Sequence, residues 1–295
     1  MNEFKTYHPI VNFMYFLCVI GFSMFLMHPV SLGITFGCAI LYALLLKGRK
    51  RTFRSLFIAL PMMLLAAIIN PMFNHAGVTV IRYLPSGNPL TAESLYYGIA
   101  AAVMLAAVIF YFSCYNLVMT SDKFVYLFGK IIPTLSLVFS MTLRFIPNLV
   151  VRLREITNTQ RTLGRDISEG SLIKRIRCAI KILSILITWS LESAVETADS
   201  MKSRGYGIPG RTAYSIFRFD KRDLSTLLWI VILSGITLAG IFRGSLKYSY
   251  FPAFSIEKIS LLTILMHTAY FLLCITPVII ELREQYRWKA IKSKI

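Results

Sequence analysis

The hydrophobic residues of this chain gather in six long stretches, separated by shorter polar or basic segments. The stretches cover about 11–27, 30–46, 56–73, 95–119, 224–242 and 259–280. A helix needs about 20 mostly apolar residues to cross a bilayer, and each stretch comes close to that length. The fourth stretch contains no Asp, Glu, Lys, Arg or His. The pattern therefore predicts an all-α, polytopic membrane protein with about six transmembrane helices.

The segment 171–203 has a different pattern, because its apolar residues recur on one face of a helix. It contains no Gly or Pro, and the residues that share the face are Leu172, Ile176, Ala179, Ile180, Leu183, Leu186 and Ile187. This spacing is the period of an amphipathic helix. The apolar part, 178–191, has only fourteen residues and includes Lys181, so it is shorter than a bilayer requires. We expect a long helix that lies along the membrane face or against partner proteins and ends before Gly205 and Gly207.

The segment 124–151 is also apolar, but charged residues and prolines divide it. The interruptions are Lys130, Pro133, Arg144 and Pro147. The pieces between them are too short to cross a membrane, so we expect another amphipathic helix near the same membrane face. Three regions follow from these patterns: N-terminal transmembrane helices in 1–120, two or three long amphipathic helices on the cytoplasmic side in 121–222, and C-terminal transmembrane helices with a basic tail in 223–295.

The distribution of basic residues predicts the orientation of the chain. The formal net charge of +18 suggests a nucleic-acid partner, but the composition is 56% hydrophobic with a mean hydropathy of +0.64, which is that of a membrane protein. If the N-terminus is cytoplasmic, all but four of the 32 Lys and Arg residues lie in cytoplasmic segments, including the loop 47–54 and the C-terminal tail. Cytoplasmic loops normally carry such an excess. We therefore predict a multi-pass protein with both termini cytoplasmic and no nucleic-acid partner.

Motifs for catalysis are absent from the sequence. There is no G-x-x-x-x-G-K-[ST] phosphate-binding loop, and the four histidines form no H-E-x-x-H pair. The predicted spans carry almost none of the buried charges that ion-coupled transporters use. We expect a non-catalytic transporter component without a cofactor or metal. Two alternatives stay open: a self-contained membrane permease, and a membrane enzyme that processes lipid or prenyl groups, although the acidic D-D-x-x-D cluster typical of the latter is missing.

Four short motifs resemble a known family along nearly the whole chain. They are Tyr7-His8-Pro9, the segment Asn70-Pro71-Met72-Phe73-Asn74-His75-Ala76-Gly77, the segment Ser140-Met141-Thr142-Leu143-Arg144-Phe145-Ile146-Pro147, and Ser203-Arg204-Gly205-Tyr206-Gly207. The chain resembles the transmembrane T component of energy-coupling factor (ECF) transporters, including those for cobalt and nickel uptake. The resemblance implies two partners: a pair of cytoplasmic ABC-type ATPase subunits, and a small membrane subunit that binds the vitamin or metal ion. It also implies the cell membrane of a prokaryote as the location.

The same resemblance implies which residues contact the ATPases. In that family two coupling helices each end in an Ala-Arg-Gly-like motif, whose arginine docks in a groove of one ATPase. Ser203-Arg204-Gly205 matches the second motif, with Ser in place of Ala. The first motif is expected in Arg161-Thr162-Leu163-Gly164-Arg165, where Leu163 stands at the position of the arginine. Either Arg161 or Arg165 replaces it, or this end docks through apolar contact.

Overall fold

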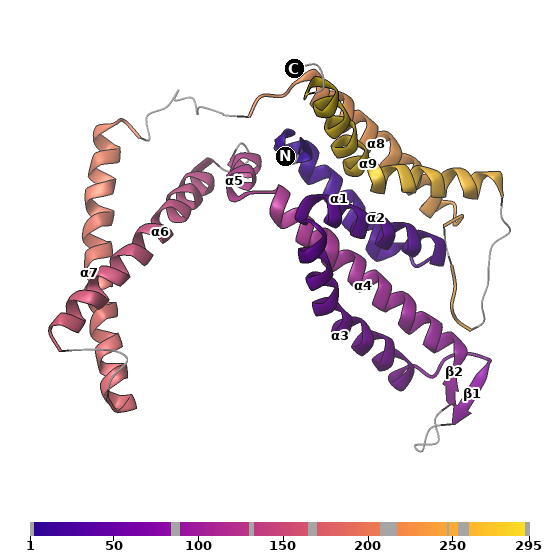
Figure 1. The fold of residues 1–295 in the computed structure, drawn as a ribbon, viewed down its shortest axis with the longest axis horizontal. Helices are drawn as coiled ribbons and strands as arrows, with labels where there is room; N and C mark the ends of the chain where they lie inside the picture. Colours follow the sequence, from indigo (N-terminus) through magenta and orange to yellow (C-terminus); the bar gives the residue numbers. More distant parts are fainter. Residues whose placement is uncertain are drawn as a thin grey trace. The chain divides into compact units, whose positions relative to one another are not determined.

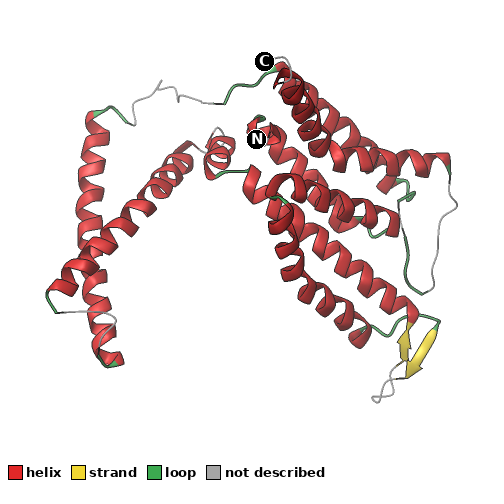
Figure 2. Ribbon diagram, viewed as in Figure 1, coloured by secondary structure: helices red, strands yellow, loops and turns green. Residues whose placement is uncertain are grey.

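The structure is a computed structural model that describes residues 3–83, 89–129, 133–164, 170–206, 217–246, 248–252 and 260–292. Almost all of the described secondary structure is helical (Figure 2). The helices are η1 Glu3–Thr6, α1 Pro9–Phe25, α2 Pro29–Lys47, α3 Arg49–Phe73, α4 Ala92–Val118, α5 Ser121–Gly129, α6 Pro133–Thr162, α7 Leu172–Ser203, α8 Lys221–Phe242 and α9 Leu261–Lys292. The predicted all-α class is confirmed, with the addition of a small hairpin, β1 Val80–Tyr83 and β2 Pro89–Thr91.

The chain forms two compact units. The first, which we call the membrane unit, consists of Met1–Thr120 and Phe217–Ile295. The second, which we call the insert, is Ser121–Ile216 and contains α5, α6 and α7 (Figure 1). The insert therefore enters the sequence between α4 and α8.

Six helices in the described part of the chain are long and apolar enough to cross a membrane. They are α2, α3, α4, α7, α8 and α9. The first predicted stretch forms α1, which is apolar but has only 17 residues. The length and composition of α7 also suffice for a span, although the apolar run 178–191 alone is short. That α7 lies along the membrane face therefore stays a prediction.

The basic segment 47–54 is not the loop that the sequence predicts. Helix α2 ends at Lys47, and α3 begins at Arg49. Only Gly48 separates them, because its φ of 79° belongs to the left-handed region that glycine adopts without strain. The basic side chains of this segment consequently lie on the first turns of α3, where Arg49 and Arg51 are exposed.

The core of the membrane unit is rich in tyrosine. Tyr15, Tyr42, Tyr111 and Tyr270 are all fully buried between α1, α2, α4 and α9. Two of their hydroxyl groups have polar partners: Tyr15 donates to the carbonyl of Cys274 at 2.9 Å, and Tyr270 shares a 2.8 Å hydrogen bond with Thr35. Burying such hydroxyl groups without partners would be costly, so these bonds help to specify how the four helices pack.

The N-terminal segment is bound by the first turn of α8 and by α9. Two buried carboxylates accept its backbone N–H groups: Asp223 that of His8 at 3.2 Å, and Glu281 that of Phe4 at 3.3 Å. Arg222 lies 4.2 Å from the centre of the Tyr7 ring, a cation–π distance. Burial raises the pKa of Tyr7, and the nearby Arg222 opposes that rise. The motif Tyr7-His8-Pro9 is therefore part of a contact that joins the two ends of the membrane unit's sequence.

The connection between α3 and α4 is organised around a buried carboxylate. Glu93, in the first turn of α4, accepts the N–H of Thr79 at 3.2 Å and also the hydroxyl of Thr79. Gly77 lies against the same carboxylate with a φ of 141°. A Cβ atom at Gly77 would lie 2.5 Å from Glu93 Oε2, so only glycine fits here. The close approach to Glu93 thus explains why the segment Asn70–Gly77 ends in glycine.

The tips of the crossed helices as a candidate functional site

The long helices α6 and α7 of the insert cross each other. Phe145 of α6 and Trp189 of α7 stack at the crossing, with ring centroids 6.1 Å apart and planes 3° from parallel. Arg152 lies 5.0 Å from the centre of the Trp189 ring on the same contact. Because the helices cross, their C-terminal ends lie apart (Figure 1). The aromatic pair fixes the crossing point, and Phe145 belongs to one of the four sequence motifs.

The C-terminal end of α7 has the hydrogen-bond pattern of a Schellman cap. The N–H of Gly205 donates to the carbonyl of Lys202 at 3.0 Å, and that of Tyr206 donates to Met201 at 3.1 Å. Gly205 has a φ of 72°, which this cap requires of the residue after the helix. Arg204 is therefore the C-cap residue, exposed at the end of a 32-residue helix. The positive side chains of Lys202 and Arg204 also interact favourably with the negative end of the helix dipole.

The C-terminal end of α6 has an equivalent turn. The helix ends at Thr162, and the N–H of Gly164 donates to the carbonyl of Arg161 at 3.0 Å. Gly164 has a φ of 73°, nearly the same as Gly205. Leu163 therefore takes the C-cap position that Arg204 takes in α7, and its side chain is 63% exposed. The structure places Thr162-Leu163-Gly164 and Ser203-Arg204-Gly205 at matching positions on the two helices.

The remaining candidate residues differ in what the structure says about them. Arg161 is exposed in the last turn of α6, one residue before Thr162. It is therefore a residue of the helix itself and does not occupy the C-cap position. Arg165 and Gly207 lie outside the described residues. Over the described chain, no three His, Cys, Asp or Glu residues lie close enough to hold a metal ion. Both tips are exposed helix ends, each closed by a glycine with positive φ.

Both long helices of the insert carry large exposed apolar side chains. On α7 they include Leu172, Ile176, Ile180, Leu183, Ile187, Leu191 and Val195, each at least half exposed. Three of these, Ile176, Ile180 and Leu183, alternate with exposed basic residues such as Lys174, Arg175, Arg177 and Lys181. Exposed apolar side chains in this number usually mark a contact with another protein or with a membrane.

Comparison with known proteins identifies the family. The family model described as "Cobalt transport protein" matches residues 5–214, which is more than half of the chain. The chain belongs to the family of ECF transporter T components. It is 33% identical over 184 residues to the "Energy-coupling factor transporter transmembrane protein EcfT" of Bacillus selenitireducens, covering 59% of this chain and 68% of the relative. The protein of that name from Lactobacillus helveticus is 42% identical over 110 residues, covering 37% of this chain and only 39% of the relative.

The sequence motifs of this T component fall into two structural groups. Tyr7-His8-Pro9 and the segment Asn70–Gly77 maintain the packing of the membrane unit, whereas Phe145 and Ser203-Arg204-Gly205 belong to the insert. Reasoning from the sequence missed the partners of these motifs, namely Asp223, Glu93 and Trp189. The two acids are separated from their partners by 215 and 14 residues, and no local pattern reveals such contacts.

Proposed function

We propose that this T component couples two cytoplasmic ABC-type ATPase subunits to a small substrate-binding membrane subunit during uptake of a vitamin or a transition metal ion. The observation that carries the proposal is the matching pair of helix ends, which expose Leu163 and Arg204 at the same C-cap position. Two equivalent contact points suit a pair of ATPase subunits, one for each tip.

Each tip would use a different kind of contact. The guanidinium group of Arg204 can make two parallel hydrogen bonds to a carboxylate in a groove of the partner, and Gly205 turns the backbone away at once. Leu163 would instead enter an apolar pocket. When the ATPases close on ATP, they would push both tips, and the rigid helices α6 and α7 would carry that displacement through their crossing at Phe145 and Trp189.

The exposed apolar faces of α6 and α7 would bind the substrate-binding membrane subunit. Their mixture of apolar and basic residues suits a position at the cytoplasmic face of the cell membrane, with both termini in the cytoplasm. Cysteine labelling tests this orientation in a background without the five native cysteines. An impermeant reagent should label Arg82→Cys on intact cells and should not label Ser171→Cys.

Co-purification tests the function itself. A tagged chain isolated from its own cells in mild detergent should bring with it two ATPase chains and a small membrane protein, and the complex should hydrolyse ATP. A chain that purifies alone and takes up substrate alone in liposomes would instead be a self-contained permease, and the coupling proposal would be wrong. Identifying the bound substrate of the small subunit by mass spectrometry would then name the transported molecule.

A further inference from the structure

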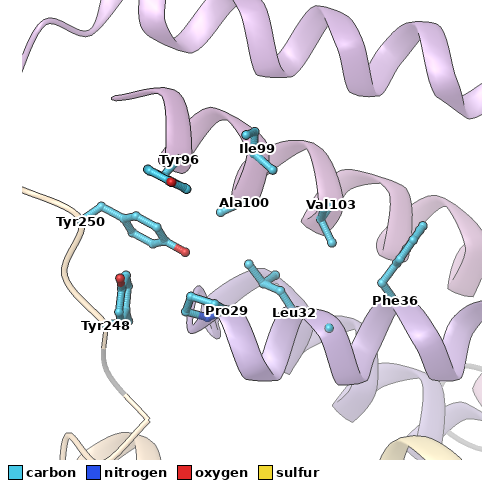
Figure 3. Close-up of a pocket in the computed structure, with 10 residues that line it drawn as sticks. Pro29, Leu32, Phe36, Tyr96, Ile99, Ala100, Val103, Tyr248 and Tyr250 are labelled. Carbon is cyan, nitrogen blue, oxygen red and sulfur yellow. The ribbon is translucent and has the colours of Figure 1, made fainter. Parts of the chain in front are cut away.

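The membrane unit contains a cavity of about 760 Å³ between α2 and α4 (Figure 3). Leu32, Gly33 and Phe36 of α2 line one side, and side chains of α4, among them Val103, line the other. Tyr248, together with the neighbouring Tyr250, closes one end. None of the four sequence motifs and neither helix tip contributes a residue to this cavity.

If α2 and α4 cross the membrane as their length and composition allow, the cavity lies within one leaflet of the bilayer. Helices α2 and α4 both begin at this end, at Pro29 and Ala92, and both are candidate spans. From Pro29 to Phe36 the cavity follows about 10 Å of helix. One leaflet contributes about 15 Å of hydrocarbon, half of the usual core thickness of about 30 Å. The apolar part of the cavity thus lies where the surrounding medium is made of lipid tails.

The two ends of the cavity differ in polarity. Tyr248, Tyr250 and Tyr96 lie at one end, and the hydroxyl group of Tyr250 donates to the carbonyl of Met27 in the turn between α1 and α2 at 2.8 Å. Tyrosines gather at the level of lipid head groups, because their rings are apolar and their hydroxyl groups are wet. The other end, at Phe36 and Val103, is wholly apolar. An elongated molecule with one polar end and an apolar tail matches this arrangement.

We propose that the cavity holds one acyl chain of a membrane phospholipid, with the head group at the tyrosine end. The other candidate is a transmembrane helix of a partner, since Gly33 and Gly37 form the G-x-x-x-G spacing that lets helices approach closely. A helix is about 10–12 Å wide and would need a broad open face. The cavity instead has the volume of a small-molecule site, about 300–1,000 Å³, and Gly37 does not line it.

The test places a larger side chain in the cavity by substituting Gly33, the glycine that lines it. A Cβ atom at Gly33 would meet nothing within 4 Å, so Gly33→Leu adds a side chain to empty space. Gly37→Leu is the matched control, because Gly37 lies one turn further along α2, is also exposed, and has the same open surroundings. Each full-length protein is placed in phosphatidylcholine nanodiscs that contain some phosphatidylcholine with a photoreactive diazirine in its acyl chain. Mass spectrometry then locates the labelled residues after irradiation.

A bound acyl chain predicts that labelling of Phe36 and Val103 is lost in Gly33→Leu and retained in Gly37→Leu. Labelling of Phe57, which is 79% exposed on α3, provides the reference for ordinary lipid contact. Equal labelling of Val103 in all three proteins, relative to Phe57, would overturn the proposal. A loss in both variants would favour a helix-packing face over a lipid site.

Unsubstituted protein gives a second measurement that does not depend on folding of a variant. A diazirine close to the ester should label the tyrosine end, and one further along the chain should label Phe36 and Val103. If the labelled residues did not change with the position of the diazirine along the acyl chain, the proposal that the cavity holds the chain in one orientation would be wrong. Val103→Phe, which narrows the cavity from α4, should reproduce the effect of Gly33→Leu on labelling of Phe36.

Discussion

The membrane unit and the insert differ in how much of their apolar surface they bury themselves. Four tyrosines, Phe4 and many aliphatic residues form a continuous core in the membrane unit. Among the described residues of the insert, only Cys178 and Ile182 are buried apolar side chains. Much of the apolar face of α7, including Leu172 at 73% exposed, is not covered by other described residues of the insert. The membrane unit is a packed domain, whereas the insert depends on its surroundings.

This difference indicates where free energy is available for assembly. Covering apolar surface contributes about 25 cal/mol per Å², and the membrane unit makes part of that gain in its own core. In the insert the gain is still available to a partner. The exposed apolar residues Ile176 and Ile180 alternate with Arg177 and Lys181, so neither water nor lipid alone suits this surface. Mutations in the insert should therefore affect assembly, and mutations in the membrane unit should affect stability.

Arg204→Glu should have the largest effect and should act mainly on assembly. It replaces a cation that we propose to be buried in the complex with an anion, and removing one member of such a pair costs about 2–5 kcal/mol. Arg204 is exposed in the isolated chain, so the free energy of unfolding should fall only by about 0.3–1 kcal/mol, through the changed interaction with the helix dipole. Pull-down of the ATPase pair and substrate uptake should both be lost, and Arg204→Lys should restore them only in part.

The matched control is Lys202→Glu, which makes the same charge change two residues earlier on an exposed position. It should retain most of the assembly, because only Arg204 occupies the C-cap. If both variants lose assembly equally, the tip acts through its general charge and not through a specific arginine.

Asp223→Ala should show the opposite behaviour. It leaves the buried N–H of His8 and the partly buried N–H of Asp220 without their carboxylate partner, at about 2–4 kcal/mol of unfolding free energy. Thermal unfolding in detergent measures the loss. Glu284→Ala is the control, because it removes a carboxylate from a surface ion pair with Arg287 and should cost less than about 1 kcal/mol. Equal effects would mean that the Asp223 contact contributes nothing particular to stability.

The sequence predicted well those features that depend on local periodicity. Five of the six predicted stretches correspond to helices long enough to span. The length of α7 follows from the absence of Gly and Pro in 171–203, and its end follows from Gly205 and Gly207. The single-residue turn at Gly48 was missed, because a cluster of charges normally suggests a loop. The hairpin of β1 and β2 was missed as well, since its strands are short and depend on Glu93, which follows them in the sequence.

Gly77→Ala should destabilise the membrane unit through both strain and collision. The φ of 141° disfavours any side chain, and the new Cβ would lie 2.9 Å from Thr91 Cβ and closer still to Glu93. We expect about 1–3 kcal/mol of lost unfolding free energy. Gly48→Ala separates the two causes, because Gly48 has a positive φ but open surroundings. A loss at Gly77 no larger than at Gly48 would show that Glu93 moves aside easily.

The functional site could be predicted only in part, for a physical reason. The Ser203-Arg204-Gly205 motif is local, so both its position and its cap could be expected from the chain. The resemblance already set Leu163 at the position of the arginine, but the matching caps could be recognised only from the positive φ of Gly164 and Gly205. The crossing depends on Phe145 and Trp189, which are 44 residues apart and carry no common pattern.

Leu163→Ala should have the smallest effect, and it decides how the first tip acts. If Leu163 enters an apolar pocket on an ATPase, losing its outer methyl groups should weaken binding by about 1–2 kcal/mol, with no change in the stability of the chain. Arg161→Ala is the matched variant: it keeps the helix, removes the nearest described cation, and should have less effect. Titration of the purified ATPase pair against each variant measures both binding affinities.

A loss of affinity confined to Arg161→Ala would assign the contact to that arginine. Leu163→Arg would then bind no better than Leu163→Ala. If Leu163→Arg instead binds the ATPase pair more tightly than the natural chain, the groove at this tip accepts a cation. The natural leucine would then make the α6 tip bind its ATPase more weakly than the α7 tip.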